Sequence, residues 1–459
     1  MPYESARTVE DRLANYRLMA ALIDRRSRRF GKGMTMHVGP LAHASRFQPE
    51  PLTKEEEAAL AFAAGGITGY AFGDLPYGNG DVNGIKEGGG QVMVRFIGRT
   101  AASGEAIHAA TIFVLNDSGV RMLRRPQDLS TTDYPQLITL AREGKLLDLY
   151  EKSSVHLMDH RPTLLRTMPF VAPFNTWDTN LPGTTYFLPV IEYSAFYINL
   201  ILTGLGEEIG MWIVDERNNF CPAGLKKFAK SRGGPLNDDL DTGIPVTLGT
   251  VETFLAQFAA VETGAMFQNL GLMAEALGLG GYIHQAQNPE WLKVLGFDIK
   301  GVPLSQVFGL GFFKRLIARL LGKDRDIPTA LGLKLDGNPL IRPFCPPWYP
   351  DMEKAVYAFI DYKYGAGHGT LRENGTTTAF KDGNAIQGRI PRYSDTTIAA
   401  TIAHCQYVYE KYGRFPAIGP LGTVLAYQAH HVDSEFYQNF YRADALGSVN
   451  RVHDHRGSA

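Results

Sequence analysis

The sequence has few cysteines and almost no net charge, and each of these features argues against particular classes of protein. Its 459 residues include only Cys221, Cys345 and Cys405, which are far apart and form no CxxC or CxxH pair. This spacing argues against a disulfide scaffold or a zinc knuckle and predicts free thiols in a reducing compartment. The formal net charge is −1, so overall charge does not favour nucleic acid or an anionic membrane as a partner.

Long apolar runs and targeting segments are also lacking. The most apolar window, residues 186–205, contains Pro189, Glu192 and Asn199, which predicts a buried helix rather than a membrane span. The first residues, MPYESARTVEDRL, lack the basic-then-apolar order of a signal peptide. With 44% hydrophobic and 20% charged residues, the chain has the composition of a globular protein with two or three domain-sized units. We therefore expect a cytoplasmic protein.

The longest helical pattern covers residues 250–277 and ends in a glycine cluster. Thr250 is the expected N-cap, and Gly278, Gly280 and Gly281 are expected to end the helix. Small residues between the apolar ones leave room for close backbone approach. The residues that recur at three- and four-residue steps are Phe254, Leu255, Phe258, Val261, Phe267, Leu270, Met273 and Leu277. The pattern predicts a buried helix packed against other helices, and such periodicity alone indicates no chemistry.

An arginine-rich segment follows a helix that we expect over residues 8–24. It carries Arg25, Ser27 and Arg29, with two further arginines at the intervening positions. Guanidinium groups donate bidentate hydrogen bonds to phosphate oxygens, and the serine hydroxyl adds another donor. The segment is therefore a candidate phosphate clamp. Alternatively, the arginines complement a helix C-terminus and face solvent.

A second candidate segment combines strands with a Ser-Gly pair. Residues 91–99 and 111–115 have the composition of strands, and a short helix is expected to open between them. Arg99, Ser103 and Gly104 lie at this opening. Taken alone, they are typical of an ordinary helix N-cap.

In this order, the three segments resemble the FMN-dependent nitroreductase superfamily. The matched motifs are R-x-S-x-[RK] over 25–29, R-x-x-x-S-G-x-x-x-H over 99–108, and a glycine-ended helix over 265–281. The resemblance implies an α+β fold, in which helices flank a mixed or antiparallel sheet and a long central helix lies at a homodimer interface. It assigns residues 1–323 to an FMN-binding domain and residues 324–459 to a C-terminal extension of unknown role.

The resemblance also implies an activity. Members of the superfamily are FMN-dependent oxidoreductases, in which flavin N5 usually takes a hydride from NADH or NADPH and passes electrons to a small nitro, quinone or ene acceptor. The superfamily needs no fixed catalytic triad, so no general base is assigned, and each site is expected to include residues of both subunits. The matched positions are Arg25, Ser27 and Arg29 at the FMN phosphate, and Arg99, Ser103, Gly104, Gly280 and Gly281 near the flavin ring.

Three alternatives to this interpretation stay open. One is an oxidase resembling the azoline dehydrogenases, a subgroup that uses dioxygen and carries an adjacent Lys-Tyr pair near the flavin. Such pairs occur here at Lys363-Tyr364 and Lys411-Tyr412, both in the extension. A second is a flavin-binding or metal-binding protein without turnover. The third alternative is a monomer in which the C-terminal extension, rather than a second subunit, pairs with the central helix.

Two further patterns in the last third of the chain are expected to bind nothing. His430, His431, Asp433 and Glu435 suggest a metal site, but adjacent histidines on one helix point about 100° apart, so we expect no metal. Residues 312–321 form a basic amphipathic helix, which we expect to pack against the body of the protein with its basic side chains exposed. A membrane-surface role is the alternative for this helix.

Overall fold

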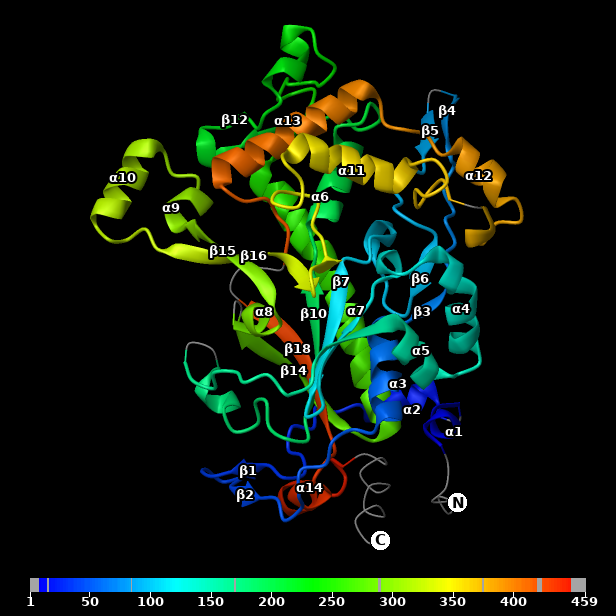
Figure 1. Ribbon diagram of the computed structural model, residues 1–459, viewed down its shortest axis with the longest axis vertical. Coiled ribbons are helices and arrows are strands. Elements are labelled where there is room, and N and C mark those ends of the chain that lie inside the picture. Colours follow the sequence, from blue (N-terminus) through cyan, green and yellow to red (C-terminus); the bar gives the residue numbers. More distant parts are fainter. Residues whose placement is uncertain are drawn as a thin grey trace.

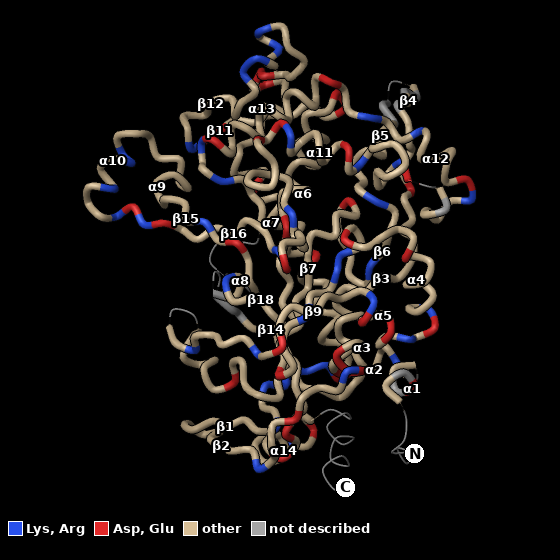
Figure 2. The backbone as a smooth tube through the Cα atoms, viewed as in Figure 1, with Lys and Arg blue, Asp and Glu red and all other residues tan. Residues whose placement is uncertain are grey.

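The computed structural model (Figure 1) describes residues 8–446, except 15, 84, 169–170, 288–289, 374 and 419–422. The first seven residues, which belong to the segment used above to argue against a signal peptide, lie outside this range. Basic and acidic residues are interspersed along the backbone (Figure 2). Within the described part of the chain, no helix combines the length and apolarity needed to cross a membrane. The three cysteines are free thiols, as predicted.

A six-stranded sheet forms the centre of the molecule (Figure 1). Every pair of neighbouring strands in it is antiparallel. In spatial order the strands are β14 (Gly280–Gln287), β18 (Thr423–His430), β10 (Thr185–Ile191), β7 (Ala110–Asn116), β8 (Gly119–Leu123) and β9 (Ser154–Met158). The α+β expectation is confirmed at this level, whereas the nitroreductase-like topology stays a prediction.

The C-terminal segment supplies a strand to the interior of this sheet. β18 pairs with β10 on one side, where Gln428 lies opposite Tyr186, and with β14 on the other, where Ala429 lies opposite Gly281. Residues 324–459 therefore share one sheet with residues 1–323. The expected domain boundary between these ranges stays a prediction.

The long helix α7 (Leu248–Leu277) confirms the strongest helical pattern of the sequence. Its N-cap is Thr247 rather than Thr250, because the Thr250 backbone N–H donates to the Thr247 hydroxyl at 3.1 Å. Gly278 ends the helix with a φ of 71°, a left-handed conformation that glycine adopts without strain. α7 packs beside α1 (Val9–Ala14), α2 (Leu18–Asp24) and α3 (Lys54–Gly65).

The helix α3 illustrates how a local motif sets an element. The Thr53 hydroxyl accepts from the Glu56 backbone N–H at 3.2 Å, and the Glu56 carboxylate accepts from the Thr53 N–H at 3.1 Å. This capping box satisfies two backbone donors at the start of the helix.

The other strands form small sheets around the centre. They pair as β1 (Thr35–Met36) with β2 (His43–Ala44), β3 (Ile67–Tyr70) with β6 (Ile97–Arg99), β4 (Gly78–Val82) with β5 (Ile85–Gly89), β11 (Met211–Asp215) with β12 (Cys221–Pro222) and β13 (Ile244–Thr247), and β16 (Asp326–Leu335) with β15 (Phe297–Pro303) and β17 (Asn338–Ile341).

Further helices surround the sheet. They are α4 (Tyr134–Arg142), α5 (Leu146–Ser153), α6 (Ser194–Gly204), α8 (Glu290–Val294), α9 (Leu304–Val307), α10 (Phe312–Leu320), α11 (Met352–Tyr364), α12 (Gly383–Arg389), α13 (Asp395–Tyr412) and α14 (Ser434–Phe440). Of these, α6, α11 and α13 lie above the sheet in Figure 1. One buried apolar cluster joins the sheet to α3, α6, α7, α11 and α13.

Two predicted elements are shorter than expected. In place of one helix over 8–24 the structure has α1 and α2, and Tyr16 and Arg17 belong to neither. The strand predicted over 91–99 is reduced to β6, because the Val94 backbone N–H donates to the Glu105 carbonyl instead of to a neighbouring strand. The stretch before β6 is therefore tied to the segment around Glu105.

The expectation that α10 packs its apolar face against the body is wrong. Phe312, Phe313 and Leu320 are 74%, 78% and 79% exposed. The basic amphipathic pattern was recognised correctly, but periodicity does not say whether a surface exists to receive the apolar face.

We predict that residues 1–323 do not fold as an isolated fragment, because removing β18 leaves β10 and β14 without the strand that joins them. Two rows of backbone donors and acceptors would lose their partners. Thermal unfolding of the fragment followed by circular dichroism should show no cooperative transition, whereas the full chain should show one. A cooperative transition in the fragment would instead support a separable domain.

Candidate functional site

The arginine-rich segment is fixed to α7 by a buried ion pair. Arg28 donates from two nitrogens to the Glu275 carboxylate, at 2.6 and 3.2 Å, and both side chains are almost fully buried. The Arg26 backbone N–H lies 3.4 Å from the same carboxylate. Arg28 also forms a backbone bridge with Gly281 of β14. The segment is therefore held between the C-terminal part of α7 and the sheet.

Two residues of the predicted phosphate clamp remain accessible. Arg25 and Ser27 are exposed, and the Arg25 guanidinium forms no ion pair with another described residue. The Arg25 side chain lies along α7, where its Cδ would be 3.3 Å from a Cβ placed at Gly271. Because side chains alternate along an extended chain, burying Arg28 leaves the flanking Ser27 free to face outward.

Arg29, the third clamp residue, already has a protein partner. Its guanidinium donates to Asp178 at 2.7 and 3.0 Å and to Asn175 at 2.7 Å. It also lies over the ring of Tyr282, 4.6 Å from the centroid. Burial lowers the pKa of Arg29, but the charge of Asp178 outweighs this effect and raises the pKa overall. Asp178 thus neutralises part of the positive charge of Arg29 that would otherwise attract a phosphate.

Gly280 and Gly281 are required by side chains of β18. A Cβ at Gly280 would lie 2.6 Å from His430 Nε2 and 2.9 Å from the Arg28 carbonyl, and one at Gly281 would overlap the Tyr427 hydroxyl. Neither ring nitrogen of His430 makes a hydrogen bond of normal geometry with the described residues. Burial lowers the pKa of His430 to about 3, so its imidazole is neutral at pH 7.

The second predicted group gathers around another glutamate of α7. Glu262 accepts from the Ser103 hydroxyl at 2.8 Å and from the backbone N–H groups of Ala110 at 2.9 Å and Ala109 at 3.2 Å. Arg99 lies 3.9 Å from the same carboxylate and donates to the Ala110 carbonyl. Burial lowers the pKa of Arg99 to about 10.

The residues after Ser103 have an unusual backbone. Glu105, Ala106 and His108 have φ values of 56°, 52° and 49°, which cost side-chain-bearing residues conformational energy. Gly104 precedes them, and a Cβ there would collide with the Phe258 ring of α7. The segment is therefore held in place by its contacts with α7.

The eight predicted site residues thus form two groups along one helix. The thirteen positions from Glu262 to Glu275 correspond to about 20 Å at about 1.5 Å per residue. The structure places Arg25, Ser27, Arg29, Gly280 and Gly281 in one group, and Arg99, Ser103 and Gly104 in the other. A single chain does not bring the two groups together.

One of the Lys-Tyr pairs lies close to the second group. Lys363 is fully buried and donates to Asn199 Oδ1 at 2.6 Å and to the Gln91 carbonyl. The Nδ2 amide nitrogen of Asn199 donates to the Glu105 carboxylate. Burial lowers the pKa of Lys363 to about 7. Tyr412 of the other pair instead donates to Asp215 of β11.

The histidine-rich pattern differs from its predicted form. His430 ends β18, and His431 follows it, so the two residues are not on one helix. His431 lies 3.3 Å from Glu56 and 3.8 Å from Glu50. Over the described residues, no group of three or more histidine, cysteine or acidic side chains has the arrangement of a metal site.

Sequence reasoning missed the carboxylates that organise both groups. Glu262 and Glu275 lie within an otherwise apolar helix, and that position was a usable signal, because a buried charge needs a partner. Asp178 lies in a stretch without periodicity and gave no such signal. The role of His430 against Gly280 depends on the strand pairing of β18, which no local pattern indicates.

Comparison with known proteins gives little guidance. No family model matches the chain, and no curated protein matches it. A crystal structure of a candidate nitroreductase from Ralstonia eutropha JMP134 is 14% identical, over 62% of this chain and 73% of that one, with a TM-score of 0.25. A likeness at this TM-score carries no argument about fold or function.

Glu275→Ala is predicted to lower the free energy of unfolding by about 3–5 kcal/mol, because it leaves the buried Arg28 guanidinium without its counter-charge. The matched control on the same helix is Glu252→Ala, which removes an exposed pair with Arg217 and should cost less than about 1 kcal/mol. Urea denaturation measures both. Equal losses in the two variants would contradict the anchoring role of Glu275.

Proposed function

We propose that the protein is an FMN-dependent oxidoreductase. The observation that carries the proposal is the accessible Arg25 and Ser27 pair, held in position by the buried Arg28–Glu275 ion pair. A guanidinium and a hydroxyl on an anchored segment offer the donors that a phosphate group requires. Arg29, the third residue of the motif, contributes less net positive charge to the clamp, because it forms an ion pair with Asp178.

A neighbouring histidine supports the same segment. The neutral imidazole of His430 lies beside Gly280 and the Arg28 carbonyl, and neither ring nitrogen makes a hydrogen bond of normal geometry among the described residues. The ring is buried and packs closely against Gly31 and Gly280. We therefore assign His430 to hold the backbone beside the arginine segment in position.

A dimer would join the two groups of site residues. If two α7 helices pack antiparallel across a two-fold axis near Gln268, the Glu275 end of one helix lies beside the Glu262 end of its partner. Gly264 and Gln268 are exposed on α7, and a Cβ at Gly264 would meet no atom within 4 Å. This open face allows a second helix to approach closely.

Exposed apolar side chains support the same interface. Val261 of α7 is 65% exposed, although it lies in the middle of a largely apolar helix. On the adjacent α2, the exposed apolar residues are Leu18, Met19, Leu22 and Ile23. Burying such side chains between two subunits is favourable by roughly 25 cal/mol per Å² of apolar surface. We therefore propose a homodimer with shared sites.

When bound, FMN would supply hydride chemistry at N5, with NADH or NADPH as the donor and a small nitro, quinone or ene compound as the acceptor. The residues of this chain would position it. Arg25 and Ser27 hold the phosphate, and the segment at Ser103 and Gly104 presents its backbone to the ring. No general base is assigned, because hydride transfer through a flavin does not require one.

Lys363 favours a second candidate, an oxidase of the azoline dehydrogenase type. Its amine is connected through Asn199 to Glu105, directly after the Ser103-Gly104 pair. A lysine with a pKa near 7 can accept a proton at neutral pH. Dioxygen consumption without any nicotinamide would favour this candidate, whereas bound flavin that neither nicotinamide reduces and that consumes no dioxygen would indicate a binding protein.

Arg25→Ala is predicted to raise the Kd for FMN about 10- to 100-fold, because one charge-assisted hydrogen bond contributes about 1.5–3 kcal/mol. The matched control is Arg26→Ala, whose guanidinium donates to the Ile23 and Arg25 carbonyls of its own chain. Fluorescence titration of flavin-free protein with FMN measures both. If the two variants bind FMN with the same Kd as the unaltered protein, the clamp is assigned wrongly.

Val261→Asp is predicted to shift the protein from dimer to monomer, because it places a charge within the proposed α7 interface. Val38→Asp is the control, since Val38 is also highly exposed but is remote from α7 in sequence and lies on the loop after β1. Sedimentation velocity gives the oligomeric state. A Val261→Asp protein that stays dimeric would place the interface elsewhere.

A further inference from the structure

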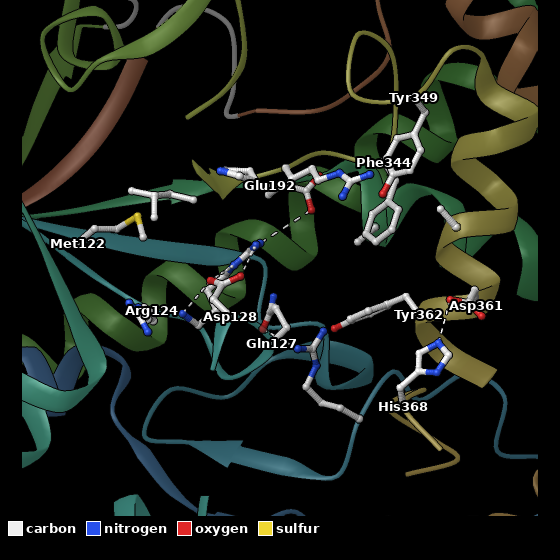
Figure 3. Close-up of a pocket in the computed structure, with 17 residues that line it drawn as sticks. Met122, Arg124, Gln127, Asp128, Glu192, Phe344, Tyr349, Asp361, Tyr362 and His368 are labelled. Atoms are coloured by element: carbon white, nitrogen blue, oxygen red, sulfur yellow. Dashed lines mark hydrogen bonds and ion pairs between the residues drawn. The ribbon is translucent and has the colours of Figure 1, made fainter. Parts of the chain in front are cut away.

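A cavity of about 690 Å³ lies away from the arginine segment (Figure 3). Its walls come from the turn after β8, the end of β10, β17 with the loop that follows it, and α11. In Figure 3, Phe344 and Tyr349 lie on one side, Gln127 and Asp128 on another, and Tyr362 projects from α11 between them. Residues from both expected domains therefore build this cavity.

The cavity wall has an excess of guanidinium groups. It contains four arginines and three carboxylates. Arg125 takes up two of the carboxylates: it donates to Asp128 at 3.0 and 3.1 Å, and Glu192 lies 3.8 Å from it. The third, Asp361, lies 2.9 Å from His368. The three remaining arginines, Arg95, Arg124 and Arg342, form no ion pair with any residue that the structure describes.

Arg95 is the deepest of these arginines. It is 4% exposed, and its guanidinium donates to the Ala106 carbonyl at 3.0 Å and to Gln127 Oε1 at 2.6 Å. Both acceptors are neutral. Burying a charge without a counter-charge costs several kcal/mol, and an anion in the cavity would offset that cost.

A second unsatisfied group lies next to Arg95. The Tyr362 hydroxyl is buried and has no hydrogen-bond partner among the described residues. The Arg95 guanidinium lies 5.6 Å from the centroid of the Tyr362 ring. The hydroxyl can therefore donate to the same ligand that Arg95 binds.

Aromatic rings line the rest of the cavity. Phe344 stacks on Tyr349 with centroids 5.9 Å apart, and it lies 5.7 Å from the Tyr362 ring. Arg342 lies over the Tyr349 ring at 4.6 Å. Such rings favour contact with a flat apolar group.

We propose that this cavity binds a small molecule that carries a carboxylate or phosphate group on a flat apolar body. Arg95 and the Tyr362 hydroxyl hold the anionic group, Arg124 and Arg342 add positive charge, and Phe344 contacts the body. The site is separate from the arginine segment of the proposed FMN site, and it does not depend on that proposal.

The back of the cavity contacts the segment after Ser103. Arg95 donates to the Ala106 carbonyl, and the Gln127 amide donates to the His108 carbonyl at 3.0 Å. Ala106 and His108 are two of the residues with positive φ. An anion that binds Arg95 therefore contacts a side chain that is hydrogen-bonded to the segment after Ser103. Glu262 binds the same segment through Ser103.

Isothermal titration calorimetry of the full-length protein tests this site with three probes that share a phenyl ring: phenyl phosphate, benzoate and neutral benzyl alcohol. At least one anion should bind saturably and at least tenfold more tightly than the alcohol. The comparison of the two anions shows which anionic group the cavity prefers. Absence of saturable binding by both anions, or equal binding of the alcohol, would overturn the proposal.

Variants assign the binding to the cavity. Arg95→Gln and Tyr362→Phe should each weaken binding of the preferred anion, Arg95→Gln by about tenfold or more. Tyr362→Phe removes only an unpartnered hydroxyl, so it should keep the fold even if Arg95→Gln does not. Arg121→Gln, outside the cavity, should bind normally.

A further variant separates this proposal from the FMN proposal. Arg25→Ala removes the clamp and should leave the binding of the preferred anion unchanged. If Arg25→Ala abolishes binding while Tyr362→Phe does not, the probe occupies the clamp and the cavity proposal is wrong. Failure of the protein to bind FMN would not alter the expected result for the cavity.

Discussion

Two buried carboxylates on α7 organise the parts of the molecule that matter for function. Glu275 holds the arginine segment through Arg28, and Glu262 holds the Ser103 segment through its hydroxyl and two backbone donors. Each carboxylate lies in an almost apolar helix, where an unpaired charge would be strongly unfavourable. Each carboxylate therefore needs a partner. The two partners fix the arginine segment and the Ser103 segment, which are far apart in sequence, against the same helix.

The C-terminal segment takes part in each candidate site. β18 brings His430 to Gly280, α11 brings Lys363 to the segment around Glu105, and the same helix brings Tyr362 to Arg95. The sequence resemblance treated this segment as an addition to a complete domain. Its strand lies inside the central sheet, so its side chains reach positions that a peripheral extension would not reach.

Local patterns predicted local structure well. The periodicity of α7 and the strand composition of residues 111–115, which lie in β7, depend on residues close together in sequence. The ion pairs that build the candidate site join residues about 150 to 250 positions apart, as in Arg29–Asp178 and Arg28–Glu275. Periodicity along the sequence does not predict contacts between residues so far apart. The exposure of α10 likewise depends on the tertiary fold, because its apolar face is buried only if another surface lies against it.

The most direct test of the account is the visible absorption spectrum of the purified protein, with the released chromophore compared by chromatography with FMN, FAD and riboflavin. We expect FMN, retained at about one molecule per chain after incubation with excess cofactor. A protein that binds no flavin under these conditions would contradict the assignment. The arginine segment would then be a structural connection between α2 and the sheet.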